Sequence, residues 1–221
     1  MRVTRLVLML VAMCMAGVNL AQAQTSQDDG GRYYAAVTAA ATFGNQSSGA
    51  FGVEVGGRVL DQLEVFIEGG HMRNLGTDTL TARANIVASF IRGTAATQQK
   101  ANYVDIGVKY RGPLFAGMWR PYIGFGIGAA KVETTSSFSV NGGDVTAQLP
   151  ALYGVVLGSD LDSSLNKVFV TVPIGVQANF MHRYFVDGSY RYGRLLAKPD
   201  EIDGDVAITA QRVQVAFGVR F

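Results

Sequence analysis

The 221-residue chain carries 19 Lys and Arg against 17 Asp and Glu, and it contains one cysteine and 27 glycines. So small a charge imbalance gives no electrostatic argument for nucleic-acid binding, and a lone cysteine excludes a disulfide framework and a thiolate metal site. Beyond the N-terminal region no apolar run approaches the roughly 18 residues of a membrane-spanning helix. Glycine-rich strands and tight turns are therefore favoured.

The N-terminal 23 residues are typical of a secretory signal peptide. Arg2 and Arg5 form a basic region, Leu6–Met15 an apolar region too short to span a bilayer, and Ala21 and Ala23 an A-x-A cleavage pattern. We expect cleavage after Ala23, and the less favoured alternative is an N-terminal anchor helix. Cleavage would remove two arginines and the cysteine, leaving 17 basic and 17 acidic residues.

Residues 24–31 are polar and are expected to form a periplasmic lead-in, and residues 32–221 are expected to form one domain. Alternation of apolar with polar or small residues predicts eight strands, each near the ten or so residues that a tilted strand needs to cross a membrane. They cover residues 32–43, 51–60, 62–73, 101–112, 119–132, 168–180, 183–194 and 209–221. The expected fold is all-β, an eight-stranded antiparallel up-and-down transmembrane β-barrel.

The predicted connections alternate between short and long. Short ones lie at 60–61, 112–118 and 181–182, and longer ones lie at 44–50, 74–100, 133–167 and 195–208. This is typical of a bacterial outer-membrane barrel with short periplasmic turns and long extracellular loops. An even strand number places both termini in the periplasm.

Two segments of the long connections have distinctive composition. Residues 133–148 are rich in Thr, Ser, Gly and Asn, which suits surface display and equally a mobile loop. Residues 151–158 are apolar, so they either extend the fifth–sixth hairpin beyond the membrane or form a short helix.

The C-terminal strand, VQVAFGVRF, shows the alternation most clearly, with apolar Val and Phe on one face. In such a barrel the apolar face contacts lipid. The positions expected to do so include Val65, Ile67, Val108, Phe125, Val176, Val215 and Phe217. A soluble lipocalin-like barrel would invert the faces and expose the glycines at 124, 126 and 128, which would make a poor solvated surface. Those inward glycines are instead expected to make room for Lys109 and Arg111.

Pro173 lies inside the sixth predicted strand. It removes a ladder donor from a barrel that has no free edge, so we expect a bulge or a local bend there.

Charged residues gather on the inward faces of the predicted strands. They are Glu54, Arg58, Glu64, Glu68, Asp105, Lys109, Arg111, Asp187, Arg191, Arg212 and Arg220. Five acidic and six basic side chains can pair almost completely, and a narrow eight-stranded lumen has room only for side chains. We expect a structural charge network in which Asp187 and Glu68 contact some of Arg58, Lys109, Arg191 and Arg212. The alternative is a proton path or an ion-selective pore.

Catalytic and metal-binding patterns are weak. After signal removal the histidines are His71 and His182, at opposite ends of the barrel, so a two-histidine metal site is not expected. No serine accompanies His71 locally, as a Ser-His-acid hydrolase acting on lipid would need. The acidic segment 198–205, with a smaller cluster at Asp160 and Asp162, could hold a divalent cation but more simply forms a solvated loop. We expect no cofactor.

Several segments together resemble a known family. PYIGFGIGAA (121–130), PIGVQANF (173–180), YFVDGSYRYGRL (184–195) and the terminal VAFGVRF are similar to small eight-stranded outer-membrane proteins of the OmpA-like and opacity-type superfamily. The resemblance implies insertion by the outer-membrane assembly machinery, which reads a C-terminal strand ending in an aromatic residue. Phe217, Val219 and Phe221 would form that assembly signal.

The sequence thus favours a monomeric, non-enzymatic outer-membrane barrel with an envelope role. Its expected partners are outer-membrane lipid, lipopolysaccharide and the assembly machinery, and its loops could bind an external ligand; no nucleic acid is expected. The main alternative is a passive channel for small solutes, and a third is a membrane-embedded lipid-modifying hydrolase.

Overall fold

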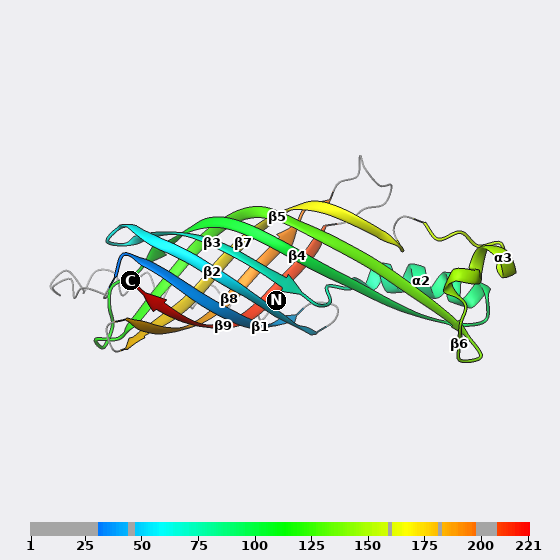
Figure 1. Cartoon of the computed structure of the whole chain (residues 1–221), viewed down its shortest axis with the longest axis horizontal. Coiled ribbons are helices and arrows are strands. Elements are labelled where there is room, and N and C mark those ends of the chain that lie inside the picture. Colours follow the sequence, from blue (N-terminus) through cyan, green and yellow to red (C-terminus); the bar gives the residue numbers. More distant parts are fainter. Residues whose placement is uncertain (1–30, 44–46, 159–160, 181–182, 198–206) are drawn as a thin grey trace, which may run out of the picture.

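The structure is a computed structural model that describes residues 31–43, 47–158, 161–180, 183–197 and 207–221. Eight long strands dominate these ranges (Figure 1). They are β1 (Tyr33–Phe43), β2 (Ser48–Leu60), β3 (Leu63–Met72), β4 (Thr94–Arg111), β5 (Trp119–Val140), β7 (Ser163–Phe180), β8 (Tyr184–Leu195) and β9 (Ile208–Arg220). Each pairs antiparallel with the next, and β1 pairs with β9, so the sheet closes. The predicted fold class is confirmed.

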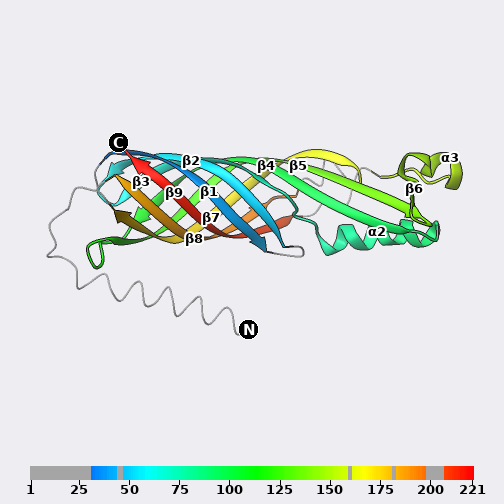
Figure 2. The same ribbon diagram turned by 60° about the horizontal axis from the view of Figure 1, so that its bottom comes forward.

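The other elements lie beyond one end of the barrel. They are α2 (Asp78–Phe90), the two-residue strand β6 (Gly143–Asp144), a 3-10 turn (Thr146–Gln148) and α3 (Leu149–Tyr153). Figures 1 and 2 show that β4 and β5 continue past the other strands as a hairpin, with α2 running along it and β6 and α3 at its far end. We call residues 74–99, 134–158 and 161–162 the projection. None of the described helices has the length and apolar character needed to cross a membrane.

Three strands extend at least five residues beyond their predicted bounds. The prediction began β4 at 101, ended β5 at 132 and began β7 at 168, where outward apolar residues stop. Backbone pairing nevertheless runs without a break between β4 and β5, from Arg111↔Tyr122 to Thr94↔Ser139. A polar sequence can continue a ladder once the strand has left lipid, because the hydrogen bonds are made by the backbone.

The segment 74–100 was wrongly predicted as a loop. It contains α2, which begins after Thr77, whose side chain accepts a hydrogen bond from the backbone N–H of Leu80. The helix buries Leu80, Ala84 and Ala88 against the hairpin. Of the two alternatives for 151–158, a short helix is found only in part, since α3 ends at Tyr153.

The two faces of the barrel wall are assigned by exposure. Ile67, Phe125 and Val215 are about half exposed on the outer surface, whereas Lys109 and Arg191 are at most 5% exposed. The remaining predicted lipid-facing residues share the outer face, with Val65 half-buried. An inverted, lipocalin-like barrel is thereby excluded.

Pro173 causes no bulge, so that part of the expectation is wrong. The β5–β7 register is the same on both sides of it, from Ile123↔Ile174 to Gly126↔Thr171, and only the pairs between these positions are missing. A Cβ atom on Gly124 would lie 3.0 Å from the Pro173 ring. Absence of a side chain at Gly124 accommodates the proline, and the ladder is interrupted without an inserted residue.

Three apolar clusters form the core. One fills the lumen toward the projection and includes Met72, Phe169, Leu195 and Ile208. A second lies toward the end that carries Tyr33 and Phe221, and includes Tyr34, Phe66 and Phe185. The third belongs to the projection and joins α2, the hairpin and α3 through Leu80, Phe138, Leu149 and Leu161. The projection therefore has a hydrophobic core of its own.

Candidate functional site

The candidate site is the polar lumen, where like charges lie side by side on each wall. Glu54 on β2 is the register partner of Glu68 on β3, which is in turn the partner of Asp105 on β4. Arg191 on β8 lies opposite Arg212 on β9 in the same way. Like charges at directly opposed positions destabilise a sheet, so each row needs partners from across the lumen.

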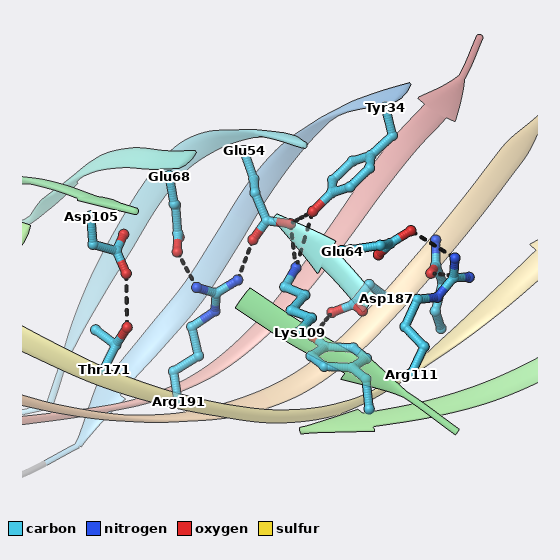
Figure 3. A network of polar contacts seen from close by, with 12 residues as sticks. Tyr34, Glu54, Glu64, Glu68, Asp105, Lys109, Arg111, Thr171, Asp187 and Arg191 are labelled. Carbon is cyan, nitrogen blue, oxygen red and sulfur yellow. Dashed lines mark hydrogen bonds and ion pairs between the residues drawn. The ribbon is translucent and has the colours of Figure 1, made fainter. Parts of the chain in front are cut away.

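Arg191 joins the two walls (Figure 3). Its guanidinium contacts Glu54 through one terminal nitrogen and Glu68 through the other. All three side chains are almost completely buried. A planar guanidinium can bind two carboxylates at once, which a lysine ammonium cannot do with the same geometry.

Lys109 forms a second centre with Glu54. Its ammonium pairs with Oε1 of Glu54, which also accepts a hydrogen bond of 2.7 Å from the Tyr34 hydroxyl. The ammonium lies 4.9 Å from the centre of the Phe66 ring and 5.0 Å from that of Tyr122, within cation–π range. Aromatic rings thus replace part of the hydration that Lys109 loses on burial.

A third centre lies nearer the terminal end of the barrel. Oε1 of Glu64 accepts from Arg111 at 2.6 Å and from Arg220 at 3.0 Å. The side-chain oxygen of Gln177 accepts from the same two guanidinium groups at 3.2 and 3.0 Å. One carboxylate and one amide therefore bridge the two arginines.

Three other predicted charges, Arg212, Asp105 and Arg58, lie outside these three centres. Arg212 contacts the Tyr103 hydroxyl and lies 3.7 Å from Glu68, so Glu68 makes two of its expected contacts. Asp105 accepts from Thr171 at 2.8 Å. Arg58 is partly exposed and lies opposite Glu64 in the β2–β3 register.

The expectation for Asp187 is wrong. None of the described cations lies in ion-pair range of its carboxylate, which accepts a 2.9 Å hydrogen bond from Tyr122 instead. The nearest centre, Lys109, is already held by Glu54. The neutral Tyr122 hydroxyl therefore satisfies Asp187, while Lys109 pairs with Glu54.

Sequence reasoning missed one buried cation and several neutral partners. Lys167 is 2% exposed, but the predicted strand began one residue after it. Tyr34, Tyr103 and Tyr122 do alternate inward in the predicted strands, so the signal was present and only charged residues were selected from it. Gln177 follows the same pattern on β7.

Little space remains in the lumen at the level of the first two centres. The space among the residues of the first two centres amounts to about 10 Å³, close to the smallest volume that holds one water molecule. Toward the projection, the apolar cluster of Met72, Phe169, Leu195 and Ile208 follows, with each side chain at most 3% exposed. At both levels of the lumen the described side chains are closely packed.

Other predicted site residues lie elsewhere or outside the described ranges. Nδ1 of His71 lies 2.7 Å from Oδ1 of Asn102 on the outer face, and no hydrogen bond joins this histidine to a serine among the described residues. The described residues contain no group of three or more potential metal ligands. His182, the segment 198–205, Asp160 and the cleavage residues Ala21 and Ala23 lie outside the described residues.

The C-terminal strand completes the seam of the barrel. Phe221 and Tyr33 exchange backbone hydrogen bonds of 3.0 Å, and their rings lie 6.5 Å apart. Phe217 packs against Tyr184 at 6.1 Å, while Val219 shares its outward face. Their role as an assembly signal remains a prediction.

Comparison with known proteins agrees with this architecture. The crystal structure of Neisserial surface protein A is 14% identical, with 86% of this chain and 97% of that chain covered and a TM-score of 0.56. A major outer membrane protein from Thermus thermophilus is 11% identical, with coverage of 86% and 99% and a TM-score of 0.51. For Ail of Yersinia pestis the values are 16%, 86%, 99% and 0.47.

The first two structures, with TM-scores above 0.5, show a shared fold and no more, because their identities are low. A sequence search of curated proteins gives no match. The family model described as the outer membrane protein beta-barrel domain, however, matches residues 7–221, nearly the whole chain. The protein is therefore a member of the outer-membrane β-barrel domain family.

Proposed function

We propose that the protein is a non-enzymatic, non-conducting outer-membrane barrel that holds a folded recognition tip outside the cell. The observation that carries this proposal is the projection, which combines a continuous β4–β5 hairpin with a hydrophobic core of its own. A disordered loop would need neither. Both termini of the barrel would then lie in the periplasm.

The surface of the projection supports a binding role. Ile86 and Phe90, one helical turn apart on α2, are 69% and 72% exposed, and Leu152 and Val156 near α3 are 62% and 81% exposed. Exposed large apolar side chains on a small folded unit are typical of protein interaction surfaces. Lipid does not explain them, because outward residues between the barrel and α2, such as Gln98 and Thr135, are polar.

The filled lumen supports an envelope role over transport. Conduction would require displacing paired charges and an apolar layer, and burying an unpaired charge costs several kcal/mol. Catalysis has less support, since His71 is held by Asn102 and no serine accompanies it among the described residues.

Cysteine labelling on intact cells tests the orientation and display. Ser137 lies exposed on the hairpin and Asp61 lies exposed in the β2–β3 turn. With a membrane-impermeant maleimide, Ser137→Cys should react on intact cells, and Asp61→Cys only after permeabilisation. The parent chain is the control, because its single cysteine, Cys14, lies in the predicted signal peptide. Labelling of Asp61→Cys alone on intact cells would reverse the orientation and defeat the proposal.

A further inference from the structure

The outer face of the barrel changes from apolar to polar along one row of cross-strand neighbours. On β4 the exposed Val104 is apolar, and Asn102, two residues nearer the projection on the same face, is polar. The partner of Asn102 on β5 is Lys131. The row continues through His71 on β3 and Asn166 on β7. Because the strands of a barrel are tilted, this row is inclined to the membrane plane and crosses the region in which acyl chains end and headgroups begin.

Three cationic side chains gather at or just beyond this row, one from each of three neighbouring strands. Arg73 directly follows β3, Lys100 lies on β4 and Lys131 lies on β5, and all three are exposed. Arg73 and Lys100 form no ion pair with any described carboxylate. Three adjacent strands span roughly 10 Å, so the charges are spread more widely than a single phosphate group can contact.

Glu133 is the acidic side chain among these cations. It pairs with Lys131 at 2.9 Å and is the register partner of Lys100. The hydrogen bond from Lys131 lowers the pKa of Glu133, and the charges of Lys131 and Lys100 act in the same direction. One carboxylate cannot balance three cations, so this part of the surface keeps an excess of positive charge.

Apolar and amide side chains flank the cations. Phe51, the register partner of His71, is 55% exposed, and its ring lies 5.5 Å from that of His71. Val104, on the membrane side of the row, is 58% exposed. Asn166 presents an amide beside Lys131. Together the surface offers apolar contact below, positive charge at the boundary and hydrogen-bonding groups suited to hydroxyls.

We propose that Arg73, Lys100 and Lys131 bind a phosphorylated glycolipid of the outer leaflet, one that carries more than one phosphate on a sugar headgroup. Its phosphates would contact the three cations, its sugar hydroxyls Asn166, and its acyl chains Phe51 and Val104. The proposal rests on the proposed function in one respect, that the projection faces the cell exterior. Lipopolysaccharide carries this chemistry in its lipid A part.

Native mass spectrometry of the refolded full chain in neutral detergent tests the site. The protein is titrated with bisphosphorylated lipid A, with its dephosphorylated form and with phosphatidylglycerol. Each of Arg73→Ala, Lys100→Ala and Lys131→Ala should weaken binding of bisphosphorylated lipid A about fivefold, and the triple variant about 100-fold. Glu133→Gln should strengthen it, because it removes the competing carboxylate.

Arg92→Ala is the matched control, since Arg92 is exposed near the far end of β4, about 20 Å from Lys100 along the strand. It should leave binding unchanged, and heat-modifiable migration verifies that every variant is folded. Equal binding of the dephosphorylated form or of phosphatidylglycerol, or unchanged binding by the triple variant, would overturn the proposal. These outcomes are measured in detergent and are independent of orientation, so failure here and failure of the cell-labelling test remain distinguishable.

Discussion

At the scale of single residues, Arg191 stabilises the charged lumen by pairing with two glutamates. Glu54 and Glu68 are direct cross-strand neighbours, and both are buried. Their repulsion is relieved by one guanidinium that contacts both from the opposite wall. The two glutamates and the arginine therefore form one unit. Without Arg191, Glu54 would keep only Lys109 as a cationic partner, and Glu68 only the more distant Arg212.

Replacing Arg191 with Ala should lower the free energy of unfolding by about 3 kcal/mol, the cost of breaking a buried ion pair. Urea unfolding of the refolded protein, followed by heat-modifiable migration, measures it. Arg194→Ala is the control, because Arg194 lies on the same strand but on the exposed outer face. Equal stability of Arg191→Ala and Arg194→Ala would contradict the assignment.

Alternation could predict that these charges point inward, but it could not predict their partners. Whether Glu54 faces Glu68 depends on the β2–β3 register, which is set by turn geometry and a bulge between Arg58 and Leu60. The tyrosine that binds Asp187 comes from a strand far away in the sequence. Long-range pairing of this kind follows from barrel closure, and no local pattern encodes it.

At the scale of elements, the β4–β5 wall depends on glycines whose neighbours come too close for a side chain. A Cβ atom on Gly128 would overlap the backbone oxygen of Val104, and one on Gly126 would lie 2.6 Å from Oγ1 of Thr171. The sequence suggested that these glycines admit Lys109 and Arg111. In the structure Lys109 lies beside Gly124, while Asp105, Thr171 and Phe66 lie beside Gly126.

Gly128→Ala should therefore lower the free energy of unfolding by about 3 kcal/mol, as overpacking a rigid site does. The matched control is Gly188→Ala on β8, where an added Cβ meets no atom within 4 Å. Both variants are compared by urea unfolding. A stable Gly128→Ala variant would mean that the β4–β5 wall is more loosely packed than its register indicates.

The fold of the projection, in contrast, was largely not predicted from the sequence. Its strands carry no lipid-facing apolar pattern, and α2 has only small residues and one leucine on its buried face. Packing on Phe138 at the end of the hairpin, rather than any local periodicity, holds the helix in place.

Phe138→Ala should accordingly destabilise the projection by about 3 kcal/mol or more, because Phe138 is fully buried. Limited trypsin digestion should then cut near Arg92 while the barrel stays intact. Phe90→Ala, at a side chain 72% exposed, is the control and should digest like the parent protein. Simultaneous loss of the barrel in Phe138→Ala would show that the two parts do not fold separately.

At the scale of the whole molecule, two different layers of side chains cross the lumen. The charge network fills the middle of the barrel, and the apolar cluster containing Phe169 and Leu195 closes it toward the projection. These two side chains are register partners on β7 and β8 and are completely buried. Ions would have to cross both layers to pass from one end of the barrel to the other.

Planar-bilayer recordings of the refolded wild-type protein should therefore show no steady conductance. Arg191→Ala should also remain closed, because the apolar layer is intact when the charge network is disturbed, and a narrow apolar constriction excludes ions and water. Only when Phe169→Ala and Leu195→Ala are added to Arg191→Ala should a leak develop, since both layers are then opened. A steady current through the wild-type barrel would instead favour the passive channel, and a current through Arg191→Ala alone would place the barrier in the charge network.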